Sequence, residues 1–244
     1  MHVKHKDYYD DSYVLSLSEK LYSVMPDFDK EAFLTAVMGH LEDKELFARF
    51  DCIVDGLEIA LKRDYAETIQ AFYPLLGPEL EQSTGMFSFG WWLWPIGRYV
   101  ERHGNDAWEA SLAFLKELTK RFTGEYAIRS LLKAHPQEVM EELILWSRDP
   151  NVHVRRLASE GVRIRLPWSQ KLTVALEDFD RYSTILTNLK DDPEKFVQKS
   201  VGNNLNDLYK EAPEKADALI RKWKKTPSSS PQEWIIKHGQ RNQK

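Results

Sequence analysis

The 244-residue sequence contains a single cysteine, Cys52. One cysteine cannot form a disulfide within the chain, and it has no second cysteine with which to bind zinc. The seven histidines are scattered without the spacing of metal ligands. Chemistry through paired thiols or cysteine-bound zinc is therefore excluded, and we expect neither a metal ion nor another cofactor.

Long apolar runs are also missing. No stretch approaches the roughly 20 residues that cross a bilayer, and the opening segment MHVKHKDYYDD lacks the apolar core of a signal peptide. With 42% hydrophobic and 30% charged residues, the chain has the composition of an ordinary folded domain. We therefore expect a cytoplasmic monomer that does not associate with membranes.

An overall positive charge, which would favour nucleic-acid binding, is absent too: the net charge is -4. The two halves of the chain nevertheless differ. Residues 1–120 contain 12 Lys and Arg against 21 Asp and Glu, whereas residues 121–244 contain 22 against 17. Any binding of a polyanion therefore belongs to the second half, whose net charge is +5.

Helical periodicity dominates what is present, and no segment alternates like a strand. Short polar breaks and breaks with glycine or proline separate the apolar repeats. The expected helices are 12–24, 29–40, 45–61, 65–75, 89–102, 106–121, 124–133, 136–147, 151–164, 169–175, 179–189, 193–209 and 213–223. The pattern predicts an all-α fold.

Two segments form an internal repeat. RDPNVHVRRLASEG aligns with DDPEKFVQKSVGNN at an offset of 43, which pairs Asp149 with Asp192 and places Pro150 and Pro193 at the first position of a helix. A period near 43 is typical of HEAT-type helix pairs. We therefore predict one HEAT-like solenoid over 1–244 with a concave basic face. It would comprise an acidic part (1–120), repeats (121–225) and a basic C-terminal tail (226–244).

Charged residues recur at helical spacing within these repeats. In the first copy, Val154, Leu157, Ala158 and Gly161 form a packing stripe, and Arg156, Glu160 and Arg163 lie on another face. Lys199, Asn203 and Asp207, and also Arg121, Glu125 and Arg129, repeat the arrangement. On spacing alone, a solvated face is the more common explanation.

The segment RRLASEGVRIRLPW contains four arginines within eleven residues, then Pro167 and Trp168. It resembles the AlkC-type branch of the AlkC/AlkD superfamily of alkylation-repair DNA glycosylases. GEYAIRSLL, SVGNNLNDLYKEAPEKA and EWIIKHGQR agree, and FGWWLWPIGRYVERHG agrees more weakly. Ser130 departs from the family pattern, where we expect proline.

This resemblance implies that Glu125, Glu160 and Asp207 are the catalytic acidic residues and that Trp168 is the catalytic tryptophan. It implies double-stranded DNA with alkylated bases as the partner, and a damaged nucleotide that is approached while still stacked. We also expect no C-terminal immunoglobulin-like domain.

The chemistry suits these residue types. A base alkylated at N3 is a cation that leaves as a neutral molecule, so positive charge develops on the sugar, as in glycoside hydrolysis. Carboxylates can stabilise that charge, and a tryptophan face can attract it. The candidate DNA contacts are Arg129, Arg156, Arg163, Arg165, Lys199, Asn203, Lys237, His238 and Arg241, although simple solvation explains any single one nearly as well. A non-catalytic binder of branched or damaged DNA and a protein-binding scaffold are the alternatives.

Overall fold

The protein is described by a computed structural model that covers residues 4–83 and 89–243. Helices and connecting loops make up this part of the chain, and no strand occurs in it, which confirms the all-α prediction. None of its helices is long and apolar enough to span a membrane. Contacts between residues divide the chain into two compact units.

The first unit comprises 1–80 and 86–122. Its elements are η1 (His5–Tyr8), α1 (Asp11–Val24), α2 (Lys30–Val37), α3 (Leu46–Ala60), α4 (Tyr65–Phe72), η2 (Tyr73–Leu76), η3 (Trp91–Leu93), α5 (Trp94–His103) and α6 (Trp108–Thr119). Aspartates cap three of these helices. Asp10, Asp29 and Asp64 each accept a hydrogen bond from a first-turn amide. In the core, α3 packs against α2 and α5, and Trp94 contacts Phe50.

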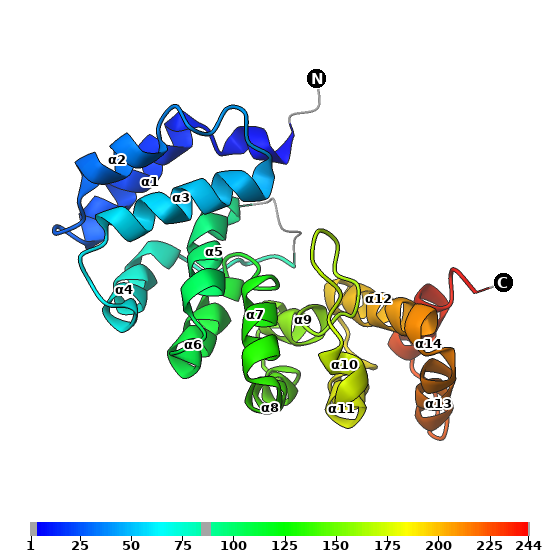
Figure 1. The fold of residues 1–244 in the computed structure, drawn as a ribbon. Coiled ribbons are helices and arrows are strands. Elements are labelled where there is room, and N and C mark those ends of the chain that lie inside the picture. Colours follow the sequence, from blue (N-terminus) through cyan, green and yellow to red (C-terminus); the bar gives the residue numbers. More distant parts are fainter. Residues whose placement is uncertain (1–3, 84–88, 244) are drawn as a thin grey trace. The chain divides into compact units, whose positions relative to one another are not determined.

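The second unit comprises 81–85 and 123–244. Its helices are α7 (Ala127–Ala134), α8 (Pro136–Trp146), α9 (Val152–Glu160), α10 (Val174–Glu177), α11 (Phe179–Leu189), α12 (Lys195–Glu211), α13 (Pro213–Trp223) and α14 (Ser230–Gly239). Within this unit α9 packs on α12 and α12 packs on α14, whereas α8 packs on α11 (Figure 1). The unit is thus built of two rows of helices. The boundary between the units lies close to residue 120, where the charge of the sequence changes sign; that the units form one repeat domain stays a prediction.

The 43-residue repeat is present in the structure of the second unit. Helices α9 and α12 begin 43 residues apart, and each follows the same turn. Asp149 accepts a hydrogen bond from the amide of Asn151 at 2.8 Å, and Asp192 accepts one from the amide of Glu194 at 2.9 Å. The predicted place of the prolines was wrong, because this turn comes first and each helix begins two residues after its proline.

Two helix predictions were also wrong in the second unit. Helix α9 ends at Glu160, and most of the predicted helix 169–175 belongs to a loop, residues 161–173, in which Pro167 has no amide to donate. The expected basic tail, for which no helix was predicted, contains α14, where the Ser229 hydroxyl accepts a hydrogen bond from the amide of Gln232 at 3.2 Å. A capping serine and Pro231 in the first turn were the signal for this helix.

Candidate active site

Three carboxylates are buried close together in the second unit. Glu125 lies in the turn before α7, Glu160 is the last residue of α9, and Asp207 lies in the second half of α12. Their exposed fractions are 3%, 5% and 3%. Carboxylates are almost never buried this deeply unless they are paired. The arrangement therefore requires cations within the cluster.

Arg156 joins the first two carboxylates. Its Nη2 atom lies 2.8 Å from Oε2 of Glu125 and 3.5 Å from Oε1 of Glu160. Its Nη1 atom donates to the Thr123 hydroxyl at 3.2 Å, and the guanidinium carbon lies 5.0 Å from the ring centre of Phe196 on α12. The predicted charged face of α9 is therefore an internal ion-pair network rather than a solvated surface.

Arg163 joins the second carboxylate to the third. Its Nη1 atom lies 2.9 Å from Oε1 of Glu160, and its Nε atom lies 3.0 Å from Oδ2 of Asp207. The backbone amide of Arg165 also donates to Oδ2 of Asp207, at 3.3 Å. Arg163 is itself only 8% exposed. The three predicted carboxylates, which come from distant parts of the sequence, are thus brought together by two arginines.

The six carboxylate oxygens are not held equally. Both oxygens of Glu160 and both of Asp207 accept hydrogen bonds, the former from Arg163 and Ser200 and the latter from Arg163. In Glu125, by contrast, both contacts are made by Oε2. This oxygen accepts a hydrogen bond from the Thr123 hydroxyl at 2.9 Å and pairs with Arg156. Within the described part of the chain, Oε1 of Glu125 accepts no hydrogen bond. It is the oxygen left to bind a water or a substrate atom.

The two glutamates differ in acidity as well. Burial raises the pKa of Glu125 and outweighs the opposing charge of Arg156. Burial also acts on Glu160, but there the charges of Arg156 and Arg163 and the Ser200 hydrogen bond prevail and lower the pKa. These surroundings favour the ionised form of Glu160 and the protonated form of Glu125, each relative to an ordinary glutamate. Two carboxyl groups with pKa values pushed apart are typical of acid–base sites.

Trp168 lies on the loop formed by 161–173. It is 61% exposed and has a φ of 61°, and no other non-glycine residue in the described chain has a positive φ. A bulky residue in this conformation is strained and needs support from its surroundings. Tyr126, the residue before α7, supplies such support by donating a hydrogen bond to the carbonyl of Pro167 at 3.3 Å.

Arg129 ties the same loop to α7. Its guanidinium donates to the carbonyls of Arg163 and Gln170, both at 2.5 Å, and to the Ser169 hydroxyl at 3.0 Å. Arg129 is only 3% exposed, and burial, with the nearby charge of Arg163, lowers its pKa to about 10. The structure thus gives the guanidinium of this predicted DNA contact a role in holding the loop.

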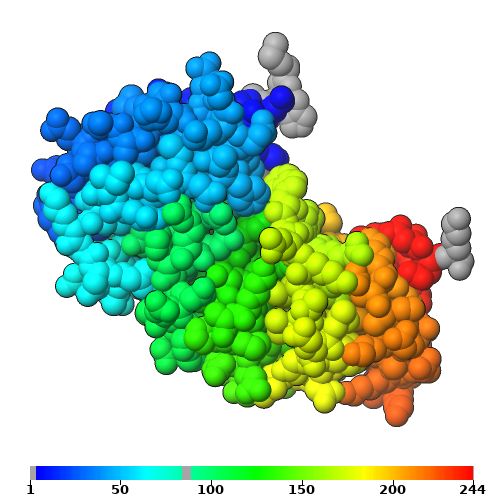
Figure 2. Space-filling view, viewed as in Figure 1, coloured from blue at the N-terminus to red at the C-terminus, as the bar shows by residue number. Residues whose placement is uncertain are grey.

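The remaining predicted DNA contacts fall into two groups. Arg165 is exposed and pairs with Glu211 at 2.6 Å. The others lie on α12 (Lys199 and Asn203), on α14 (Lys237 and His238) and in the turn after α14 (Arg241), and α12 packs against α14. The Oδ1 atom of Asn203 accepts a hydrogen bond from Arg241 at 3.1 Å and another from Nε2 of His238 at 3.0 Å. Figure 2 shows α14, in red, against α12 and α13, in orange.

Cations also line a cavity of about 540 Å³ beside α14. Lys224, Lys237 and Arg241 contribute to its wall, together with Glu233 and Gln240. Two of these cations belong to the predicted DNA contacts. The surface of α14 therefore combines exposed positive charge with a hollow.

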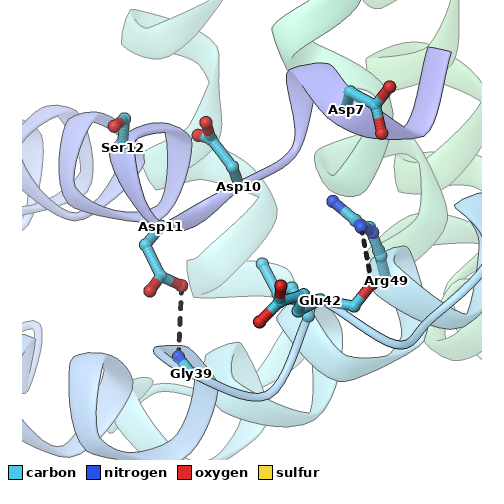
Figure 3. Close-up of a pocket in the computed structure, with 8 residues that line it drawn as sticks. Asp7, Asp10, Asp11, Ser12, Gly39, Glu42 and Arg49 are labelled. Carbon is cyan, nitrogen blue, oxygen red and sulfur yellow. Dashed lines mark hydrogen bonds between the residues drawn. The ribbon is translucent and has the colours of Figure 1, made fainter. Parts of the chain in front are cut away.

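The first unit has an acidic cavity of about 370 Å³, which Figure 3 shows. Three of its four carboxylates have structural partners. Asp10 caps α1, Asp11 accepts the amide of Gly39 at 3.1 Å, and Asp7 accepts the amide of Lys4 at 3.2 Å. Arg49 at its edge donates to four backbone carbonyls. These contacts explain the residues of this cavity by folding alone, in contrast to the carboxylate cluster of the second unit.

Sequence reasoning missed the hydroxyl groups that hold the carboxylates. Thr123 donates to Glu125, and Ser200 donates to Oε2 of Glu160 at 2.6 Å. Ser200 lies 40 residues from Glu160, so no local spacing relates the two. The 43-residue repeat gives no signal either, because it aligns Ser200 with Leu157.

Comparisons with known proteins agree on one family. The family described as "DNA alkylation repair enzyme" matches residues 99–237. The uncharacterized protein YhaZ of Bacillus subtilis is 33% identical over 239 residues, which cover 97% of this chain and 63% of YhaZ. The alkylpurine DNA glycosylase AlkC of Pseudomonas fluorescens, solved bound to DNA with an abasic site analog, has a TM-score of 0.86 at 31% identity, over 99% of this chain and 65% of that chain. The chain thus spans slightly less than two thirds of the length of both.

Proposed function

The chain belongs to the DNA alkylation repair enzyme family, and from this premise we propose that it is a monofunctional DNA glycosylase. It hydrolyses the N-glycosidic bond of cationic alkylated bases in double-stranded DNA, with 3-methyladenine and 3-methylcytosine as the first candidates. The observation that carries the proposal is the cluster of Glu125, Glu160 and Asp207, three buried carboxylates held by two arginines. The likeness to an alkylpurine DNA glycosylase supports it.

The reaction needs stabilisation of positive charge more than it needs an acid. When the bond between the sugar and the base breaks, its electron pair goes to the cationic base, which leaves neutral, and the sugar becomes an oxocarbenium-like cation. A carboxylate about 4 Å from such a charge contributes roughly 4 kcal/mol at an effective dielectric of about 20. That corresponds to about a thousandfold in rate. Glu160 and Asp207, whose oxygens are all fixed, are placed to stabilise this charge without rearrangement.

Glu125 has the features of the group that activates water. Its Oε1 atom is free to accept a hydrogen bond, and its raised pKa makes it a better proton acceptor than an ordinary glutamate. The water oxygen bonds to the sugar carbon, and the water proton passes to Glu125. No other proton donor is required, because the base leaves without being protonated.

Trp168 acts from the loop beside the cluster. Its exposed indole can face a cationic sugar or base through the ring quadrupole, and the contacts that support the preceding residue hold its strained backbone in place. An exposed tryptophan is suited to a nucleotide that stays in the duplex, so we propose that the enzyme acts without a base pocket. The cationic surface of α12 and α14 then holds the phosphates.

The test is release of free base from duplex DNA that contains 3-methyladenine, 3-methylcytosine or 7-methylguanine. Asp207→Asn and Glu160→Gln are expected to lower the rate about a hundredfold to a thousandfold, because each removes a charge from the cluster. Glu211→Gln is the matched control: Glu211 is a nearly buried, ion-paired carboxylate on α12, but its partners are Arg165 and Lys171 rather than the cluster.

Full activity of both cluster variants would contradict the assigned roles. Salt-sensitive DNA binding by the wild-type protein, without release of any of the three bases, would instead select the non-catalytic binder.

A further inference from the structure

Two serine hydroxyls lie in a line that ends at Glu160. The Oγ atoms of Ser159, on α9, and Ser200, on α12, are 2.6 Å apart. Ser200 donates to Oε2 of Glu160, also at 2.6 Å. Both serines are buried, with exposed fractions of 0% and 3%. These contacts cross between two helices at the point where the carboxylate is held.

The direction of the hydrogen bonds follows from the number of protons. Each hydroxyl has one proton to donate. Because an ionised carboxylate can only accept, the Ser200 proton goes to Glu160. The 2.6 Å contact between the two hydroxyls is then made by the Ser159 proton, which also has the carbonyl of Arg156 as a more distant acceptor at 3.1 Å, so the chain runs from Ser159 through Ser200 to Glu160. Hydrogen bonds in such a chain polarise and strengthen one another.

Asn204 fixes the backbone beneath this chain. Its amide nitrogen donates to the carbonyl of Ser159 at 2.8 Å and to that of Ser200 at 3.1 Å. Its amide oxygen accepts the hydroxyl of Tyr182 at 3.2 Å. Asn204 is fully buried, so it locks the register of α9 against α12. The hydroxyl chain is therefore rigid rather than an adaptable polar contact.

We propose that Ser159 and Ser200 are positioning residues of the active site, which hold Glu160 as an oriented anion in the direction of the sugar. The inference rests on the proposed glycosylase function. Neither serine touches the substrate; both act through Glu160. Without Ser200, Oε2 of Glu160 would lose the hydrogen bond that fixes its rotation.

The charges around Glu160 decide the sign of the expected pH effect. Arg156 of α9 and Arg163 of the following loop favour its ionised form, whereas Glu125 opposes it from the turn before α7; Asp207 of α12 faces Arg163. The Ser200 hydroxyl favours the ionised form as well. Removing this hydroxyl leaves the other groups in place, so the carboxyl protonates at a higher pH.

Ser200→Ala is the decisive variant. We expect kcat for base release at neutral pH to fall about tenfold, with the affinity for DNA unchanged. The acid limb of the pH–rate profile should contain two transitions, a higher one from Glu125 and a lower one from Glu160, and the lower one should move to higher pH. Ser159→Ala should change kcat and the acid limb in the same directions but by less, because Ser200 still donates to Glu160. Ser200→Thr, which keeps the hydroxyl, should restore the wild-type profile.

Ser183→Ala is the matched control. Ser183 is a buried serine of α11 whose hydroxyl donates only to the carbonyl of Asp180, at 3.1 Å. A structural effect of losing a buried hydroxyl would appear in both proteins, whereas a shift of the acid limb should appear only in Ser200→Ala.

An NMR titration of the Glu160 carboxyl carbon, with and without Ser200, tests the inference independently of activity. Equal titration midpoints in wild type and Ser200→Ala, or unchanged pH–rate profiles, would overturn it. A wild-type protein that releases no base but shows the Ser200-dependent midpoint would refute the glycosylase function and leave the positioning of Glu160 standing.

Discussion

Arg163 is the residue on which the cluster most depends, because it neutralises two buried carboxylates at once. Removing one partner of a buried ion pair leaves an uncompensated charge and typically costs 3–5 kcal/mol. We predict that Arg163→Ala lowers the free energy of unfolding by about that amount, as measured by urea denaturation at neutral pH. Arg165→Ala is the control, since Arg165 is exposed and its ion pair with Glu211 contributes at most about 1 kcal/mol. Similar losses in the two variants would contradict the prediction.

Glu160 gives the protein a dependence of stability on pH. Because its pKa in the folded protein lies below the ordinary value of 4.5, the folded state binds its proton less readily than the unfolded state. Its contribution to stability is therefore complete above pH 4.5 and is lost as the pH falls through the folded pKa. Between pH 6 and pH 3, Glu160→Gln should lose less stability than wild type in thermal or urea unfolding.

The contribution of Glu125 to stability changes with pH in the opposite direction, so this residue serves as the comparison. Its folded pKa is raised, so its contribution is complete below pH 4.5 and declines as the pH rises through the folded value. Glutamine resembles the protonated form of Glu125. As the pH falls, Glu125→Gln should therefore lose stability more steeply than Glu160→Gln does. Identical pH dependences of the two variants would show that the two carboxyls do not differ as the structure indicates.

At the scale of elements, the loop 161–173 matters more than any helix, because it carries Trp168. We predict that Arg129→Met, which removes the guanidinium but keeps much of the apolar stem, frees this loop. Its amides should exchange hydrogen faster and the loop should become sensitive to proteases, while the unfolding of the second unit changes less. Base release should fall even though every cluster carboxylate remains. Lys133→Met is the control, since exposed Lys133 makes one weaker contact, 3.3 Å to Gln170.

The sequence predicts an element well when local residue patterns determine it, and poorly when contacts between distant residues do. Helices α9 and α12 follow from a local apolar stripe and from a repeat of 43, and both were found, although each begins later than predicted. The loop depends on contacts that cross 34 to 41 residues, from Arg129 to the carbonyls of Arg163 and Gln170. Periodicity cannot show a side chain that binds backbone carbonyls of another element. Most of the loop, 161–164 and 169–173, was therefore predicted as helix.

In the site, too, local motifs were predicted and long-range contacts were not. Glu125, Glu160 and Asp207 were named through their motifs, and Arg156 and Arg163 lie at helical steps from Glu160. The spacing did not reveal that these arginines face inward, because a charged stripe has the same sequence pattern whether it meets solvent or a second charged stripe. Only the packing of α9 on α12 decides this. Ser200 became visible as a partner of Glu160 for the same reason.

At the scale of the whole molecule, the net charge of -4 conceals where DNA would bind. The second half of the sequence carries a net charge of +5, and three exposed cations among the predicted DNA contacts, Lys199, Lys237 and Arg241, lie on α12, on α14 and in the turn after α14. A lysine or arginine that contacts a phosphate releases a counterion, so the logarithm of the binding constant falls with the logarithm of the salt concentration. Each lost contact lowers the slope by about one.

We predict that replacing Lys199, Lys237 and Arg241 together with glutamine weakens binding to any duplex and lowers this slope by up to about three, as measured by fluorescence anisotropy between low and moderate salt. The effect should not depend on the DNA sequence or on methylation of the bases, because the phosphates are the same in every duplex. Lys20, Lys30 and Lys62 of the first unit provide a control variant with the same change in net charge. If that control lowers the slope as much as the α12–α14 variant, the DNA is attracted by the overall charge of the protein, and the assignment of a phosphate-binding surface to these two helices fails.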